Sequence, residues 1–395
     1  MNNQRRKNFN KQLPVIPNSP LPPLYAAWMD DLFAAPIPSE SDATCDDCAM
    51  CAGSDEEKAA STTFFDPHVK CCSYLPELPN YLVGRVLADG RATSNVGRSS
   101  MAKRLEAGVA VTPLGIGQPR AFAFIYERAG ASAFGQSRTL ICPHFVDEGG
   151  GRCGIWEHRG VVCATWFCKF VRGAKGRDFW AALKRLLSSV ERSLSYWCVL
   201  QVGLGSETLR QVFSPPVPVD GRALDGIMDS ETYGALWGTW LGREAEFYQE
   251  CSRLVAGLRW QDVLAAGGSE VQLFARLARD AYLKLTSDEI PARLKVGTFQ
   301  IVRMDQDSRR VVSYSGMDPL DLPKVLVDVL PYFDGRPTNQ AITDVAASEG
   351  VNLHPDLVRK LSDFEVLVPY DGSTPETTQQ TLSCFPFRKS NSSGC

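Results

Sequence analysis

The stretch "RDFWAALKRLLSSVERSLSYWCVLQVGL" (residues 177–204) decides the middle of the fold. Its apolar side chains recur at spacings of three and four: Phe179, Leu183, Leu186, Leu187, Val190, Leu194 and Trp197. This spacing places them on one face of an α-helix, as expected for a helix packed against a core. The stretches 231–258 and 270–285 repeat the pattern. The sequence therefore predicts a helical region over residues 176–290.

The pattern changes C-terminal to this region. "RLKVGTFQIVRMD" (293–305) and "RRVVSYSG" (309–316) are typical of two strands joined by a turn. Three short helices then follow within residues 322–364, and "EVLVP" (365–369) ends the pattern with a strand. This order predicts a small winged-helix-like module over 291–371, followed by a disordered tail over 372–395.

The N-terminal part of the chain lacks long periodic segments. Residues 1–40 are rich in proline, so we expect a flexible arm with one or two helical turns at "LYAAWMDDLFAA" (24–35). Residues 41–175 are rich in cysteine and glycine, and we expect a loop domain that a bound metal holds together. Taken together, the chain is predicted to be an α+β protein.

Composition narrows the classes of function. The 395 residues carry a formal net charge of −3, which gives no general affinity for nucleic acid. The basic N-terminus lacks the apolar segment of a secretory signal, and no apolar run reaches the roughly 18 residues of a membrane span. We therefore expect a cytoplasmic protein that does not enter the membrane.

Cysteine is the most informative residue type in the chain. Nine of the 13 cysteines lie within residues 45–168: Cys45, Cys48, Cys51, Cys71, Cys72, Cys142, Cys153, Cys163 and Cys168. In a reducing compartment this density favours metal binding or redox chemistry over structural disulfides. The alternative is that they are buried or oxidised without metal. Cys198 and Cys251 lie in predicted helices, where a free cysteine packs as a small apolar residue.

The spacing of the nine thiols is compatible with metal ligation. In "CDDCAMC" (45–51) three thiols share one face of a helix, or follow one another in a loop as in zinc and iron–sulfur sites. In "HVKCC" (68–72) either one of the adjacent cysteines ligates or the two serve different metals. We expect an iron–sulfur cluster or zinc at one or two sites. His68, His144 and His158 are candidate substitute ligands, and Trp156 and Trp166 would shield the site.

The second half of this region resembles a known family. "CPHFVDEGGGRCGIWEHRGVVCATWFC" (142–168) is similar to the YkgJ-like cysteine-cluster proteins, described as zinc- or iron-chelating. The matching residues are Cys142, Pro143, Cys153, Ile155, Trp156, Arg159, Cys163 and Cys168. The upstream half departs from the family's compact CxxxCxxCC motif, because an insert separates Cys51 from Cys71 and Cys45 is an additional thiol. Gly160 replaces the proline that usually follows the arginine.

The C-terminal module resembles a second family. "DGRPT" (334–338) and the pattern that follows are similar to PqqD-like winged helices, which recognise leader peptides. The resemblance implies a peptide or protein partner, whereas acidic residues on the third helix disfavour DNA. Sequence reasoning thus predicts a metalloprotein that takes part in metal-dependent modification of a peptide or protein. The alternative is a regulatory or binding protein with purely structural zinc. No catalytic residue is identified.

Overall fold

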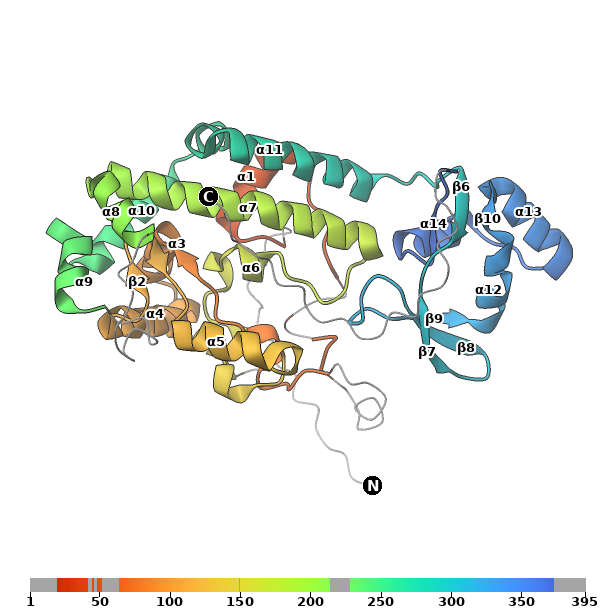
Figure 1. Cartoon of the computed structure of the whole chain (residues 1–395), viewed down its shortest axis with the longest axis horizontal. Coiled ribbons are helices and arrows are strands. Elements are labelled where there is room, and N and C mark those ends of the chain that lie inside the picture. The colour runs from red at the N-terminus through yellow and green to blue at the C-terminus, as the bar shows by residue number, and fades with distance from the viewer. Residues whose placement is uncertain are drawn as a thin grey trace, which may run out of the picture.

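The computed structural model describes residues 20–41, 45, 48–51, 64–148, 150–213 and 228–372. The protein is α+β, as predicted, with long helices and four small antiparallel sheets among the described residues. Figure 1 shows a large helical body on one side and a smaller mixed module on the other. In the part of the chain described here, no helix combines the length and the apolar character needed to cross a membrane.

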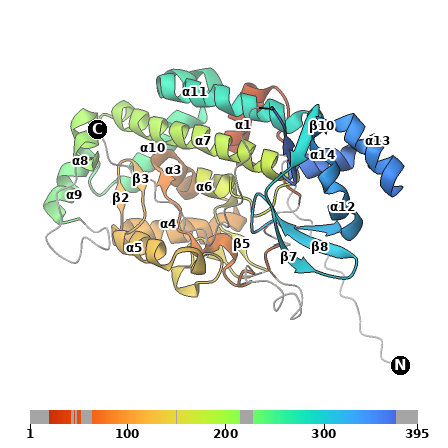
Figure 2. The same cartoon turned by 45° about the vertical axis from the view of Figure 1, so that its right-hand side comes forward.

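Two long helices form the backbone of the large body. They are α7 (Gly173–Gln201) and α11 (Trp260–Thr286), which lie side by side and run in opposite directions (Figures 1 and 2). The apolar stripe predicted for α7 is buried, from Phe179 to Leu194. Helix α11 begins ten residues before the predicted start and contains a break at Gly268, whose φ of +62° favours glycine.

The predicted helix over residues 231–258 is two helices. Helix α9 (Ser230–Trp237) ends at Gly238, and α10 (Glu244–Ala256) begins after Gly242. Both glycines have positive φ, at +49° and +77°, which turns the chain out of a helical path. Helix α8 (Gly205–Phe213) precedes them. The predicted helical region therefore contains more separate helices than its periodicity indicates.

The expected N-terminal arm is ordered where the structure describes it. Residues 20–40 contain α1 (Pro23–Phe33), whose Tyr25 and Met29 are fully buried. Trp28 donates from its indole N–H to the carbonyl of Leu258, so α1 packs beside the helices of the large body. Helix α1 lies where the helical turns were predicted, and its buried aromatic side chains pack it into the core. Residues 1–19 lie outside the described part.

The cysteine-rich region has more regular structure than predicted. It contains the short helices α3, α4, α5 and α6 and two small sheets, ordered β1-β3-β2 and β4-β5. Their bounds are α3 (Asn80–Ala88), α4 (Asn95–Ala107), α5 (Arg120–Ala129), α6 (Val161–Ala164), β1 (Leu78–Pro79), β2 (Val111–Thr112), β3 (Gly115–Ile116), β4 (Phe145–Val146) and β5 (Arg152–Cys153). One set of buried apolar residues extends from Leu21 to Leu285. The predicted boundary at residue 175 therefore does not separate two cores.

The C-terminal module has its own buried core, from Leu294 to Leu367. Its elements are β6 (Arg293–Val296), β7 (Gln300–Met304), β8 (Ser308–Val312), β9 (Leu320–Pro323), α12 (Lys324–Val329), β10 (Asp334–Pro337), α13 (Thr338–Glu349), α14 (Pro355–Asp363) and β11 (Leu367–Pro369). The first predicted strand divides at Gly297 into β6 and β7, which join different sheets, ordered β10-β6-β11 and β7-β8-β9. A Cβ at Gly297 would lie 2.2 Å from the carbonyl oxygen of Glu365, so glycine is required there. The predicted tail lies outside the described residues from 373 onward.

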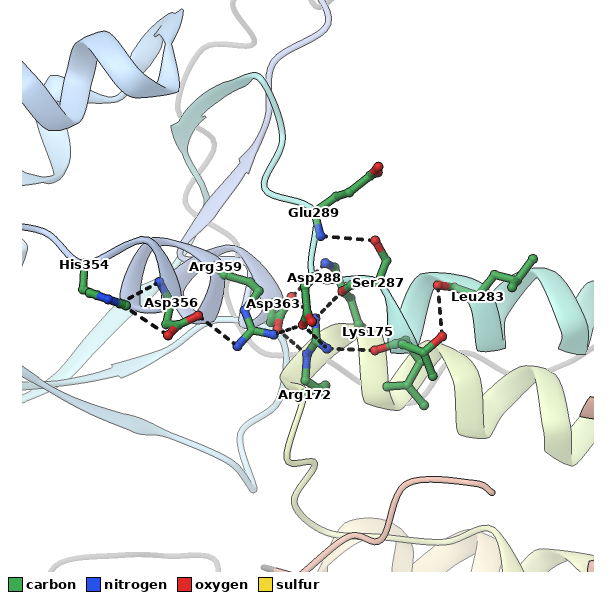
Figure 3. Close-up of polar contacts among 12 residues, drawn as sticks. Arg172, Lys175, Leu283, Ser287, Asp288, Glu289, His354, Asp356, Arg359 and Asp363 are labelled. Carbon is green, nitrogen blue, oxygen red and sulfur yellow. Dashed lines mark hydrogen bonds and ion pairs between the residues drawn. The ribbon is translucent and has the colours of Figure 1, made fainter. Parts of the chain in front are cut away.

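Charged side chains join the module to the large body (Figure 3). Arg172, at the start of α7, donates to the buried carboxylate of Asp363 on α14 and to the carbonyls of Leu285 and Ser287. Lys175 lies 2.9 Å from the same carboxylate. Because Arg172 contacts the ends of both long helices and the module, it connects the two cores at one point.

Candidate functional site

Six of the nine predicted ligands line one cavity of about 60 Å³. They are Cys45, Cys48, Cys71, Cys72, Cys153 and Cys168. They come from four segments that are far apart in the sequence, and Trp166 and Phe167 form part of the wall. The eleven cysteines that the structure describes are free thiols. A space of this size holds a few water molecules or one small inorganic group.

The other three predicted ligands lie next to the cavity. The amide of Cys51 donates to the carbonyl of Cys48 at 2.9 Å, so this segment forms a turn in its described part and not a helix. Cys142 and Cys163 lie close enough to Cys153 for the charges of their thiolates to interact. The sequence therefore identified a group of residues that the fold does bring together.

A backbone hydrogen bond holds the adjacent cysteines against the segment that begins at Cys142. Cys71 and Cys72 lie on the short 3-10 helix η1 (Lys70–Ser73). The carbonyl of Cys72 accepts a hydrogen bond of 2.6 Å from the amide of Cys142. Both thiols of the pair line the same cavity, which places them at one site and not on opposite sides of the chain.

A tight hairpin presents Cys153. Strands β4 and β5 are antiparallel, with Phe145 opposite Cys153. Gly150 and Gly151 lie in the turn with φ of +94° and +77°, which other residues rarely adopt. A Cβ at Gly151 would also come within 2.8 Å of the Phe145 ring. The glycines at 150 and 151, before Cys153, are therefore explained by the turn itself.

A half-buried carboxylate anchors the last segment. Glu191 of α7 accepts a hydrogen bond of 2.7 Å from the amide of Val161, at the start of the helix that carries Cys163. The hydroxyl of Tyr25 donates to the same oxygen. Burial raises the pKa of Glu191 to about 7, although both hydrogen bonds oppose this shift. The large helical body thus positions the cysteine segment through one acidic side chain.

Lys70 is a buried cation at the cavity wall. Its side chain is 6% exposed, and its ammonium group donates to the carbonyls of Cys45, Gly150 and Gly151. These three carbonyls belong to the first and third cysteine segments. Within the described ranges, no carboxylate forms an ion pair with Lys70. The lysine therefore joins two cysteine segments and leaves a positive charge beside the thiols.

Arg159 is a second buried cation. Its side chain is 4% exposed, and its guanidinium lies 3.7 Å above the ring of Trp156. It donates to the carbonyls of Trp156 and Pro20, while its Nε has no partner among the residues that the structure describes. Thiolate charge on Cys153, Cys45 and Cys163 would interact favourably with it. Since a buried charge without a counter-charge is costly, these thiols would become its partners once they lose their protons.

Burial keeps most of the metal-free thiols protonated. It raises the pKa of Cys45, Cys142 and Cys168 to about 12. Cys71 is the exception, because a hydrogen bond from the Cys72 thiol lowers its pKa, with Lys70 and Arg159 acting in the same direction. The pKa of Cys72 is raised by that same hydrogen bond and by burial. Any metal that binds here must therefore displace protons.

The three histidines do not face the cavity. His68 is exposed and lies 3.0 Å from the carboxylate of Asp147. His144 contacts Ser100 through Nδ1, and His158 contacts Asp89 through Nε2. None of the described residues that line the cavity is a histidine. Of the two tryptophans predicted to shield the site, Trp166 lines the cavity, whereas Trp156 packs over Arg159.

The side chains around the cavity are of the type that binds thiophilic metals. In the described part of the chain, their positions do not yet form a binding site. Thiolates bind zinc and iron–sulfur clusters, and the cavity wall consists largely of thiols. Among the residues with described positions, however, no three Cys, His, Asp or Glu side chains converge closely enough to hold one ion. Binding would require the thiols to turn toward a common point.

Sequence reasoning missed Lys70 and Glu191. Glu191 lies between the buried residues Val190 and Leu194 of α7, and a lone acidic residue in an apolar stripe is a signal for a buried polar contact. Lys70 directly precedes the cysteine pair in "HVKCC". Its position also depends on a φ of +51°, which the sequence does not indicate because lysine rarely adopts it.

No family model, curated protein or solved structure matches this chain. The function must therefore be argued from the site itself.

Proposed function

We propose that the cysteine cavity binds iron–sulfur or zinc through a subset of the nine thiols, as the resemblance to the YkgJ-like proteins implies. One observation carries the proposal: six thiols from four segments line one cavity beside two buried cations, Lys70 and Arg159. Four thiolates around a divalent ion leave a double negative charge, which two adjacent cations would balance. When bound, such a centre supplies either a cross-link between loops or a site for electron transfer.

The size of the cavity favours a closed centre over an open catalytic one. Catalytic metal sites keep a ligand position open for water or substrate. A space of about 60 Å³, walled in part by Trp166 and Phe167, is well below the roughly 300–1,000 Å³ of ligand pockets. Of the two predicted roles, we therefore favour a metalloprotein whose metal orders the cysteine segments over one that modifies a peptide at this metal.

Metal analysis of the intact chain tests the proposal. After anaerobic purification we expect about one or two metal centres per chain. Absorbance near 400 nm indicates iron–sulfur, and a colourless protein with zinc indicates a structural site. Cys153→Ser should lower the metal content, whereas Cys251→Ala, in the helical core, should not. Less than about 0.2 metal per chain in aerobic and anaerobic preparations contradicts the proposal.

A second proposal concerns the C-terminal module. We propose that this PqqD-like, winged-helix-like module binds an extended amphipathic peptide along β7. All five residues of β7 are exposed, and β7 is an edge strand of its sheet. Val302 and Met304 of this strand are 55% and 69% exposed. An edge strand offers unpaired backbone groups, and alternate side chains give selectivity.

The same module is poorly suited to DNA. On α14, Arg359 pairs with Asp288 and Asp356, so its charge is not available to phosphates. Titration of the intact chain with candidate extended peptides and with duplex DNA separates the alternatives. We expect saturable peptide binding that Val302→Glu weakens and Val325→Glu, at another exposed valine of the module, does not. Salt-dependent DNA binding without peptide binding contradicts this proposal.

A further inference from the structure

A groove of about 640 Å³ runs along α4, on the side facing away from the core. Helix α4 packs inward through Gly97 and Met101; a Cβ at Gly97 would lie 2.3 Å from the carbonyl oxygen of Gly154. The groove is lined by Asn95, Val96, Ser99, Ser100, Lys103, Arg104, Ala107, Val109 and Pro143. The helical residues in this set are spaced by four, so they form one continuous face of α4. This volume falls in the range of small-molecule sites.

The groove is positively charged and has apolar walls. Lys103 and Arg104 are its charged residues, and no carboxylate is found among the described residues that line it. Val96, Val109 and Pro143 provide apolar surface. A site of this composition is complementary to a molecule that carries one negative group on an apolar body. One pair of cations is too few for a nucleic-acid backbone, which needs a longer basic surface.

Arg104 and the neighbouring His144 each have one buried nitrogen without a partner among the described residues. Arg104 donates through Nη2 to the carbonyl of Gly117, but its buried Nη1 has no partner within the described residues. His144, 1% exposed, lies 2.7 Å from the hydroxyl of Ser100, and its buried Nε2 is likewise unpartnered in the described structure. Buried polar groups are nearly always hydrogen-bonded, and of these two residues Arg104 is the one that lines the groove.

We propose that this groove binds a small organic anion, a carboxylate or phosphate ester with an apolar body. Lys103 and Arg104 hold the negative group, and Val96, Val109 and Pro143 contact the apolar part. The site does not depend on the proposed metal. Pro143 nevertheless follows Cys142 directly in the chain, so the groove and the cysteine region share one loop.

Ligand titration of the intact chain tests this site. The probes are hexanoate, phenyl phosphate, inorganic phosphate and uncharged hexanol. Their binding is measured by calorimetry and by chemical-shift changes. We expect saturable binding of hexanoate or phenyl phosphate, and the tighter of the two identifies the negative group. Hexanol and inorganic phosphate should bind at least about tenfold more weakly, because hexanol lacks the negative group and inorganic phosphate lacks the apolar body.

Two variants test the location. Lys103→Glu should weaken binding of the tighter probe at least about tenfold, because it reverses one of the two charges. Ser99→Asp, which adds a carboxylate within the groove, should act in the same direction. Both positions are exposed, so circular dichroism should confirm folded protein. Lys184→Glu, on the exposed side of α7, should leave binding unchanged. No saturable binding of either organic anion, equal binding of hexanol, or equal weakening by Lys184→Glu overturns the proposal.

Discussion

The cysteines around the cavity and the two in the helical core show what distinguishes a candidate site from packing. Cys198 on α7 and Cys251 on α10 are fully buried among apolar residues, and the Cys198 thiol donates to the carbonyl of Cys251 at 3.8 Å. Around the cavity, thiols from separate loops lie beside Lys70 and Arg159. Burial raises the pKa of thiols in both regions. Buried cations near the thiols therefore separate the two regions better than burial does.

The largest expected effect comes from removing the proposed metal. Treating the intact protein with a chelator under reducing conditions should lower the free energy of unfolding by about 10 kcal/mol, because binding of the proposed metal would contribute to folding. Cys153→Ser should reproduce most of this loss, whereas Cys251→Ala should cost about 1 kcal/mol. Denaturant titration followed by circular dichroism measures both. Equal losses for the two variants would remove the distinction between the regions.

Arg159→Met tests the role of the buried cation. The substitution keeps an apolar side chain of similar length but leaves the carbonyls of Trp156 and Pro20 without a donor and the thiolates without their counter-charge. We expect a loss of about 4 kcal/mol together with lower metal content. Arg185→Met, at an exposed position of α7, is the matched control and should change neither quantity. Full metal content and stability in Arg159→Met would show that the cation is dispensable.

Glu191 links the helical core to the cysteine segments and makes that link depend on pH. Its pKa rises from an ordinary value of 4.5 to about 7 in the folded protein. A carboxyl group with a raised pKa favours the folded state below about pH 4.5, and this contribution is lost as pH rises through about 7. The stability of Glu191→Gln relative to the unsubstituted protein should therefore increase by up to about 3 kcal/mol from pH 5 to pH 8.

Unfolding curves of both proteins at the two pH values measure this difference. Glu106→Gln, at an exposed position on α4, should show no such change. A constant difference between Glu191→Gln and the unsubstituted protein would mean that the carboxyl group does not titrate in this range.

The smallest expected effect is at the junction with the C-terminal module. Arg359 pairs with Asp288, whose side chain is 82% exposed, so this cation differs from Arg159 in having both solvent and a carboxylate partner. Arg359→Gln should cost less than about 1 kcal/mol, and high salt should reduce the effect further. A loss as large as that of Arg159→Met would mean that burial is not what makes a cation important in this fold.

Sequence reasoning predicted elements wherever local pattern determines structure. The stripe of α7 repeats over several turns, so its burial was predictable. The division of a predicted strand at Gly297 was not, because it depends on the distant carbonyl of Glu365. At the candidate site the thiols were predictable from their density. Lys70 was not, since its partners lie 25 to 81 residues away and its backbone conformation is uncommon for lysine.

The position of α1 has a consequence for synthesis on the ribosome. Tyr282 donates to the carbonyl of Pro36, and Arg279 to that of Leu32, across 246 and 247 residues. At about 5–20 residues per second, more than about 10 s pass before α1 can reach these partners. During that time an apolar helix from the first tenth of the chain has no native partner on α11. The contacts between α1 and α11 can therefore form only late in synthesis, after α11 has emerged.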